Sequence, residues 1–274
     1  DLFIYPAERF NSARACMRDT ILRLGAKGEH ETFDYQGREG AIGNIHFSMS
    51  GIEHRAWVIA LPLNTEGDPL RHSQPILLAL AHAPVSAGQL DTLYFSALDS
   101  IAPTAADRLA PGPITSYAWP RQDPLRVSLA GLGIELTIDT HDAEANQQVV
   151  EREAIILTRY ADHPRWLEAW ERFYRIIYRD AFTRLKTAAF ELERHFTRDN
   201  RLDPNSKADP ESWKQDLLEG SLSWVQGFRY ERDLEGSDFV NLVSAAIEGR
   251  GDCDSRAMLI AIILDQAAIP AHIM

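Results

Sequence analysis

Short apolar runs separated by turn-forming residues fill the first part of the chain. Apolar positions recur every three or four residues over 6–24 and Gly25 follows, which predicts an amphipathic helix. Residues 42–51 alternate between apolar and polar, the pattern of a half-buried strand. The continuous apolar run at 56–61 is typical of a strand covered on both faces.

Two further apolar runs follow, and we expect 75–83 to be a compact helix and 91–98 to be another buried strand. Strand, helix and strand in this order make a βαβ unit, whose crossover joins parallel strands. We therefore predict that residues 1–150 form an α/β domain with a partly parallel sheet.

From Glu151 onward the apolar period becomes helical. One long helix is predicted at 164–196, with a single stripe that we interpret as a core-facing surface: Trp166, Trp170, Phe173, Ile177, Ala181, Leu185, Ala188 and Leu192. After a polar connection, helices are expected at 210–229, at 238–248 and from Cys253 onward. Residues 151–274 therefore form a second, mainly helical region.

Composition narrows the range of partners. The chain has 28 Lys and Arg against 40 Asp and Glu, a formal net charge of −12, and no long basic tract. Nucleic acid and anionic membranes are therefore not expected as partners. No run approaches the roughly 20 apolar residues of a membrane-spanning helix, so no integral membrane segment is predicted.

The two cysteines differ in their surroundings. Cys16 falls at helical spacing among small apolar residues and is predicted to be buried. Cys253 follows Gly249 and Gly251 and is expected at the start of a very apolar helix. Backbone N–H groups there favour a thiolate, whereas the flanking residues Asp252 and Asp254 oppose it.

Three segments around Cys253 resemble the bacterial transglutaminase-like superfamily, which has papain-like cysteine chemistry. They are Trp224–Asp233, the Gly-Asp-Cys segment Gly249–Ala257, and Ala268–Met274, and they span about 215–274. The resemblance implies that 151–274 includes the start of a transglutaminase-like α+β domain. It also implies a peptide or protein substrate and no cofactor or metal.

By this resemblance Cys253 is the nucleophile that forms a thioester with a carboxamide or peptide carbonyl. Its own backbone N–H and Trp224 are the candidate oxyanion contacts. In this family a histidine and an aspartate follow the cysteine on later strands, but the sequence stops after Met274. Three explanations stay open: a fragment, which we favour, a base from elsewhere, or a lost reaction.

Other histidines fit the role of base less well. His272 precedes the position that the family uses. His54 and Asp139 echo the family's His and Asp segments only in a permuted order, and a histidine before a buried strand is commonplace.

The run Val58–Asn64, the predicted helix at 75–83 and the run Leu93–Asp99 follow one another along the N-terminal half. In this order the elements over 1–150 resemble, more faintly, the α/β fold of M28-type zinc aminopeptidases. The metal ligands of that family are missing, and only Asp68 and Asp99 remain as candidates. Zinc needs about three convergent ligands, so no metal site is predicted. The resemblance implies a scaffold that has lost its metal and works as a binding or packing module.

The sequence thus leads to two hypotheses. The first is a cysteine peptidase or transglutaminase-like enzyme of the periplasm or cell envelope, acting through Cys253. The second is a non-catalytic binding or scaffold protein with enzyme-like folds. The absence of Met at residue 1 leaves a removed upstream segment open, and the oligomeric state stays undetermined.

Overall fold

A computed structural model describes residues 1–63, 74–197, 212–232 and 237–271. The chain divides into two compact units, Asp1–Pro120 (unit 1) and Arg121–Met274 (unit 2). The boundary therefore lies at Pro120 rather than near residue 150.

Unit 1 is built on a five-stranded sheet with the order β1-β5-β4-β3-β2. Its strands are β1 (Leu2–Tyr5), β2 (Lys27–Tyr35), β3 (Arg38–Met49), β4 (Ile52–Pro62) and β5 (Ile76–Pro84). Every neighbouring pair is antiparallel. The unit is α/β as predicted, but the prediction of a partly parallel sheet is wrong.

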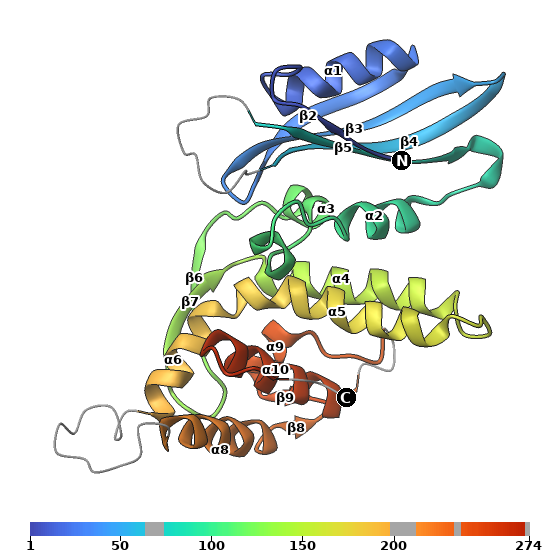
Figure 1. The fold of residues 1–274 in the computed structure, drawn as a ribbon. Helices are drawn as coiled ribbons and strands as arrows, with labels where there is room; N and C mark the ends of the chain where they lie inside the picture. The colour runs from blue at the N-terminus through green and yellow to red at the C-terminus, as the bar shows by residue number, and fades with distance from the viewer. Residues whose placement is uncertain (64–73, 198–211, 233–236, 272–274) are drawn as a thin grey trace. The chain divides into compact units, whose positions relative to one another are not determined.

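Helices cover both faces of this sheet (Figure 1). Helix α1 (Ala13–Leu24) packs on one face, where Cys16 and Met17 join a core cluster with Ile45 and Val58. Helices α2 (Asp91–Asp99) and α3 (Pro113–Ala118) cover the other face, where Leu98 and Ile114 are buried. Two 3-10 turns, Val85–Ala87 and Ala106–Leu109, complete the unit.

The predicted βαβ unit is wrong, because the segment predicted as a helix is a strand and the segment predicted as a strand is a helix. The predicted helix at 75–83 is strand β5, which lies between β1 and β4 and is covered on both faces, so its sequence shows no alternation. The predicted strand at 91–98 is helix α2, whose Tyr94 and Leu98 bury one helical face four residues apart. Apolar runs of this length do not distinguish the two structures.

Unit 2 is mainly helical. Its helices are α4 (Asp142–Thr158), α5 (Trp166–Arg184), α6 (Lys186–Phe196), α8 (Ser212–Gln226), α9 (Leu242–Glu248) and α10 (Cys253–Gln266). A hairpin, β6 (Pro124–Ser128) and β7 (Glu135–Asp139), precedes them, and β8 (Arg229–Tyr230) pairs in parallel with β9 (Arg250–Gly251).

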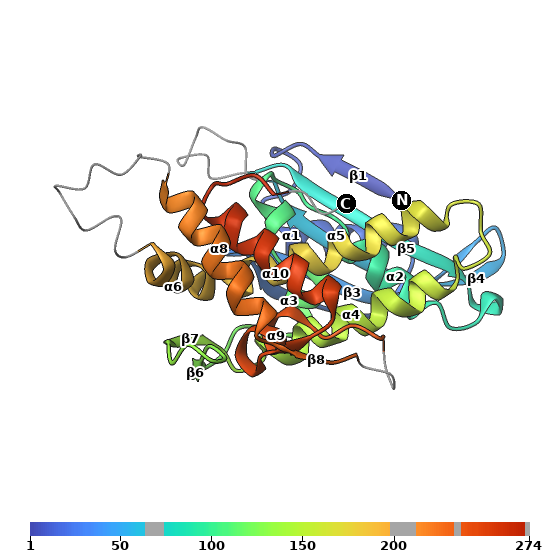
Figure 2. The ribbon, with the colours of Figure 1, turned by 90° about the horizontal axis from the view of Figure 1, so that it is seen from below.

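Helices α4 and α5 lie side by side (Figure 2). The predicted single helix at 164–196 is in fact α5 and α6, which meet at Leu185. The break lets α6 pack against α8 and α10 while Leu192 stays in the same core as Ile177. From Phe173 to Leu192 the apolar stripe is core, as expected, but its first two members, Trp166 and Trp170, are 50% and 39% exposed, so the stripe is wrong at its N-terminal end.

A buried polar network fixes the helices of unit 2 to one another. Arg184, 7% exposed, donates hydrogen bonds to Asp180 on α5 and to Asp142 on α4. Asn146 donates to Asp180 and accepts from the backbone N–H of Leu242 on α9. Burial by itself would lower the pKa of Arg184, but the two carboxylates raise it, so the guanidinium stays charged.

Among the described helices, none combines the length and the apolar character needed to cross a bilayer.

Candidate functional site

Two glycines shape the approach to Cys253. Gly249 ends α9 in the left-handed conformation with φ 65°, and a Cβ there would lie 2.8 Å from the Cβ of Ala130. A Cβ on Gly251 would lie 3.0 Å from the Cβ of Ser255. Both glycines are therefore required by close packing and by backbone conformation.

Asp252 starts the cysteine helix. Its Oδ1 accepts from the backbone N–H of Ser255 at 2.8 Å, the standard N-cap arrangement. The hydroxyl of Ser255 lies 2.8 Å from the same oxygen and 3.0 Å from the carbonyl oxygen of Val240. Since Asp252 is 5% exposed and Ser255 is fully buried, this cap is part of the core.

Cys253 is the first residue of α10, and its side chain is exposed. The rest of the helix is anchored by buried residues that include Met258 and Ile262. The sequence thus predicted the start of this helix correctly. The structure presents the thiol at a fixed helix N-terminus.

Carboxylates dominate the electrostatics of this thiol. Sγ donates a hydrogen bond to Oδ1 of Asp254 at 3.3 Å. This bond first, then burial and the charges of Asp254 and Asp252, raise the pKa of Cys253, while the backbone at the helix start lowers it. Asp254 and Asp252 therefore favour the protonated thiol.

Asp254 also fixes a second side chain. Its Oδ2 accepts a hydrogen bond from the hydroxyl of Tyr174 on α5. Burial, followed by this bond, raises the pKa of Tyr174, so the phenol stays neutral. Asp254 thus bridges Cys253 and Tyr174 and is held in place from the helix next to it.

A positively charged side chain packs behind the site. Arg256 donates to the carbonyl of Phe228 at 2.7 Å, and its guanidinium lies 5.9 Å from the centre of the Tyr230 ring. Tyr230 pairs with Gly251 across the short β8–β9 ladder. This ladder brings the segment that follows α8 next to the cysteine segment.

Trp224, the candidate oxyanion contact, is occupied. It is 7% exposed, its indole Nε1 donates to the carbonyl of Ala130 at 2.8 Å, and its ring meets Phe228 edge-on. An indole has a single N–H donor, so Trp224 has none left for a substrate. Its position is that of a core residue.

The other candidate residues are satisfied locally or lie outside the described residues. In unit 1, His54 is buried with Nδ1 3.0 Å from Nδ1 of His82. In unit 2, Asp139 accepts from the backbone N–H groups of Gln122 and His141. Asp233 and His272 belong to segments that the structure does not describe. The hydrogen-bond partner of Sγ in the described part of unit 2 is a carboxylate and not an imidazole.

Of the two candidate metal ligands in unit 1, one is satisfied locally and the other lies outside the described residues. Asp99 is buried and accepts from the N–H and hydroxyl of Thr115, which ties α2 to α3. Asp68 lies outside the described residues. Within the residues that are described, no group of three or more His, Cys, Asp or Glu side chains could hold a metal ion. Cys16 is fully buried as predicted, and burial raises its pKa to about 11.

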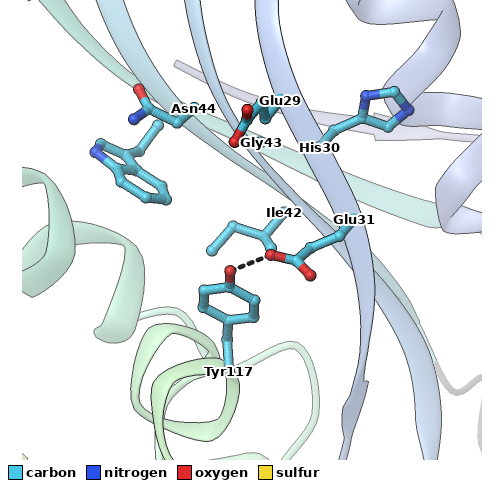
Figure 3. A pocket seen from close by; sticks show the side chains of 8 residues that line it. Glu29, His30, Glu31, Ile42, Gly43, Asn44 and Tyr117 are labelled. Atoms are coloured by element: carbon cyan, nitrogen blue, oxygen red, sulfur yellow. Dashed lines mark hydrogen bonds between the residues drawn. The ribbon is translucent and has the colours of Figure 1, made fainter.

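Unit 1 contains a cleft that the sequence did not reveal (Figure 3). It has a volume of about 540 Å³ and lies between the sheet and Tyr117 of α3. Its other lining residues come from three neighbouring strands: Glu29, His30, Glu31, Ile42, Gly43, Asn44 and Trp57. Residues 27–35, for which no element was predicted above, form β2. The alternation of polar and aromatic side chains at Thr32, Phe33, Asp34 and Tyr35 was the signal for a strand.

Comparisons of the chain with protein-family models, with curated proteins and with solved structures found no match.

Proposed function

We propose that unit 2 belongs to a transglutaminase-like domain in which Cys253 acts as a thiol nucleophile on amide or peptide carbonyls. One observation carries the proposal: Cys253 is exposed at the first position of a helix whose body is buried. The contrast with Cys16, which is fully enclosed, supports a role for Cys253 other than packing.

The chemistry follows from this placement. The thiolate sulfur adds to the carbonyl carbon, and the carbonyl oxygen becomes an oxyanion that backbone N–H groups at the start of α10 are suited to receive. Collapse of this intermediate breaks the C–N bond, and the amine leaves with a proton. The thioester on Cys253 is then cleaved by water or passed to a second amine.

The thiol needs a proton acceptor before attack. Asp254 accepts the S–H hydrogen bond but raises the pKa of Cys253, so it stabilises the thiol instead of the thiolate. The proposal therefore requires a base of higher proton affinity than Asp254, such as the histidine that follows the cysteine in the transglutaminase-like superfamily.

A non-catalytic binding protein is the second candidate. It is favoured by the raised pKa of Cys253, because a protonated thiol is a weak nucleophile. The occupied indole N–H of Trp224 points the same way.

Trapping of the thioester separates these candidates. The full chain is incubated at alkaline pH, where the solvent deprotonates the thiol in place of a histidine, with glutamine-containing peptides and hydroxylamine, which converts a protein thioester into a hydroxamate. The catalytic proposal predicts a hydroxamate that disappears in Cys253→Ala and persists in Cys16→Ala. No hydroxamate, or the same yield from Cys253→Ala, would overturn it and favour the binding protein.

A further inference from the structure

We infer that the cleft of unit 1 binds a small organic cation that carries N–H donors, and that a guanidinium group fits it best. Three features of the cleft support this: the acceptors that line it, the nearby donors that are already used, and its aromatic side chains. The cleft lies within unit 1 and involves no residue of the Cys253 site.

The cleft contains acceptors that lack donors. The carboxylate of Glu29 has no hydrogen bond or ion pair within the described residues. Oδ1 of Asn44 is buried and likewise has no partner there. Glu29 and Asn44 are direct partners in the β2–β3 ladder, so their side chains stand next to each other on one face. Figure 3 shows both at the same side of the cleft.

A buried oxygen without a donor is rare in folded proteins, because it loses its hydrogen bond to water. This applies to Oδ1 of Asn44, whereas Glu29 is exposed and its carboxylate is open to water. A ligand N–H between the two side chains would donate to the Asn44 oxygen and lie beside the Glu29 carboxylate, so these two groups favour a ligand that donates.

Tyr117 adds acceptor character to the cleft. The hydroxyl of Tyr117 donates to Glu31, so only its acceptor capacity remains for a ligand. The hydrogen bond to Glu31 first, then burial and the charges of Glu31 and Glu29, raise the pKa of Tyr117 to about 12. Both carboxylates therefore act on the same hydroxyl and face the same space.

The indole donor of Trp57, which lines the cleft, and the nearby guanidinium of Arg55 are already used. Nε1 of Trp57 donates to Asp91 at 2.8 Å, and Arg55 pairs with the same carboxylate at 3.0 Å. Neither side chain is therefore free to neutralise Glu29 and Glu31. The cleft keeps the negative charge of two carboxylates.

The ring of Trp57 makes the cleft specific for a flat cation. Trp57 pairs with Asn44 across the β3–β4 ladder, and its ring is held edge-on by Phe95 with centroids 4.9 Å apart. Cations bind to aromatic faces, and a planar guanidinium can stack on a ring while its N–H groups reach two acceptors. The volume of about 540 Å³ lies in the range of small-molecule sites.

The test uses a matched pair of ligands and a matched pair of variants in the full chain. Butylguanidinium is the probe, and butylurea has nearly the same shape without the charge. Glu29→Gln removes the free carboxylate. Glu39→Gln removes the same charge from the opposite face of the same hairpin, where Glu39 pairs with Asp34. Both glutamates are exposed, so neither change is expected to disturb folding.

Binding is measured by isothermal titration calorimetry at low salt. We expect one saturable site for butylguanidinium, no comparable binding of butylurea, and a loss of about tenfold in affinity in Glu29→Gln with Glu39→Gln unchanged. Equal binding of the two ligands, equal losses in the two variants, or no saturation below roughly 10 mM would overturn the inference.

A second arm identifies the source of the cation. A capped Gly-Arg-Gly peptide is compared with butylguanidinium in the same titration. Tighter binding of the peptide assigns the cleft to arginine side chains of a polypeptide, whereas tighter binding of butylguanidinium assigns it to a free small molecule.

Discussion

Replacing Asp252 tests whether the cysteine helix is held by its N-cap. Asp252→Ala removes the acceptor of the Ser255 N–H and one of the two acceptors near its hydroxyl. Loss of an N-cap costs about 1 kcal/mol, and loss of a buried bond to a charged acceptor adds to this. The hydroxyl of Ser255 keeps the carbonyl of Val240, which limits the addition. We expect Asp252→Ala to lower the free energy of unfolding by about 1–3 kcal/mol.

Asp252→Asn is the matched control, because asparagine retains an Oδ1 acceptor and caps helices as well as aspartate does. We expect it to stay within about 0.5 kcal/mol of the unmodified chain. It also removes a charge that raises the pKa of Cys253, so this pKa should fall while the helix remains intact.

Urea unfolding followed by circular dichroism gives the free energies, and amide hydrogen exchange over 253–266 shows whether the loss is local to α10. The reasoning would be refuted by an unchanged stability of Asp252→Ala, or by an equal loss in Asp252→Asn.

Three further predictions concern single side chains. Asp254→Asn removes the carboxylate that raises the pKa of Cys253, so alkylation of Cys253 by iodoacetamide at neutral pH should accelerate. The rate is followed by intact-mass analysis, with buried Cys16 as the internal reference. An unchanged rate would contradict this prediction. Arg184→Met leaves Asp142 and Asp180 buried without their cation, so it should lower the free energy of unfolding, measured in urea, by about 3–5 kcal/mol. Arg194→Met is the control at an exposed ion pair with Glu191 and should lower the free energy of unfolding by less than about 1 kcal/mol. Similar losses in Arg184→Met and Arg194→Met would contradict the prediction. Glu31→Gln removes the main cause of the raised pKa of Tyr117, so this pKa should fall from about 12 toward 10.0 in a phenolate absorbance titration, with Tyr117→Phe identifying the step.

The sequence predicted the elements that carry their own start and stop signals. The start of α10 was predictable because Asp252 caps it and two glycines precede it. Helix α1 was predictable from its spacing and from Gly25, which ends it in the left-handed conformation. These signals are local, so they can be recognised without knowing what the element packs against.

The elements whose identity depends on their neighbours were not predictable. Strand β5 has a continuous apolar sequence because helices cover both faces of its sheet, and the same run would suit a buried helix. The hydrogen bond of the Trp224 indole N–H could not be predicted either, because its acceptor, the carbonyl of Ala130, lies 94 residues away in the sequence. The raised pKa of Cys253 depends on the rotamer of Asp254, which no spacing rule gives.

The two edges of the sheet in unit 1 differ in what they offer to another strand. The β2 edge carries exposed charged residues, Lys27, Glu29 and Glu31 among them, which discourage pairing with a foreign strand. The β1 edge exposes Leu2, Phe3 and Ile4, at 56%, 47% and 60%. Of the two edges, β1 is therefore the one more open to another strand, and Phe3→Lys would place a charge there that discourages such pairing.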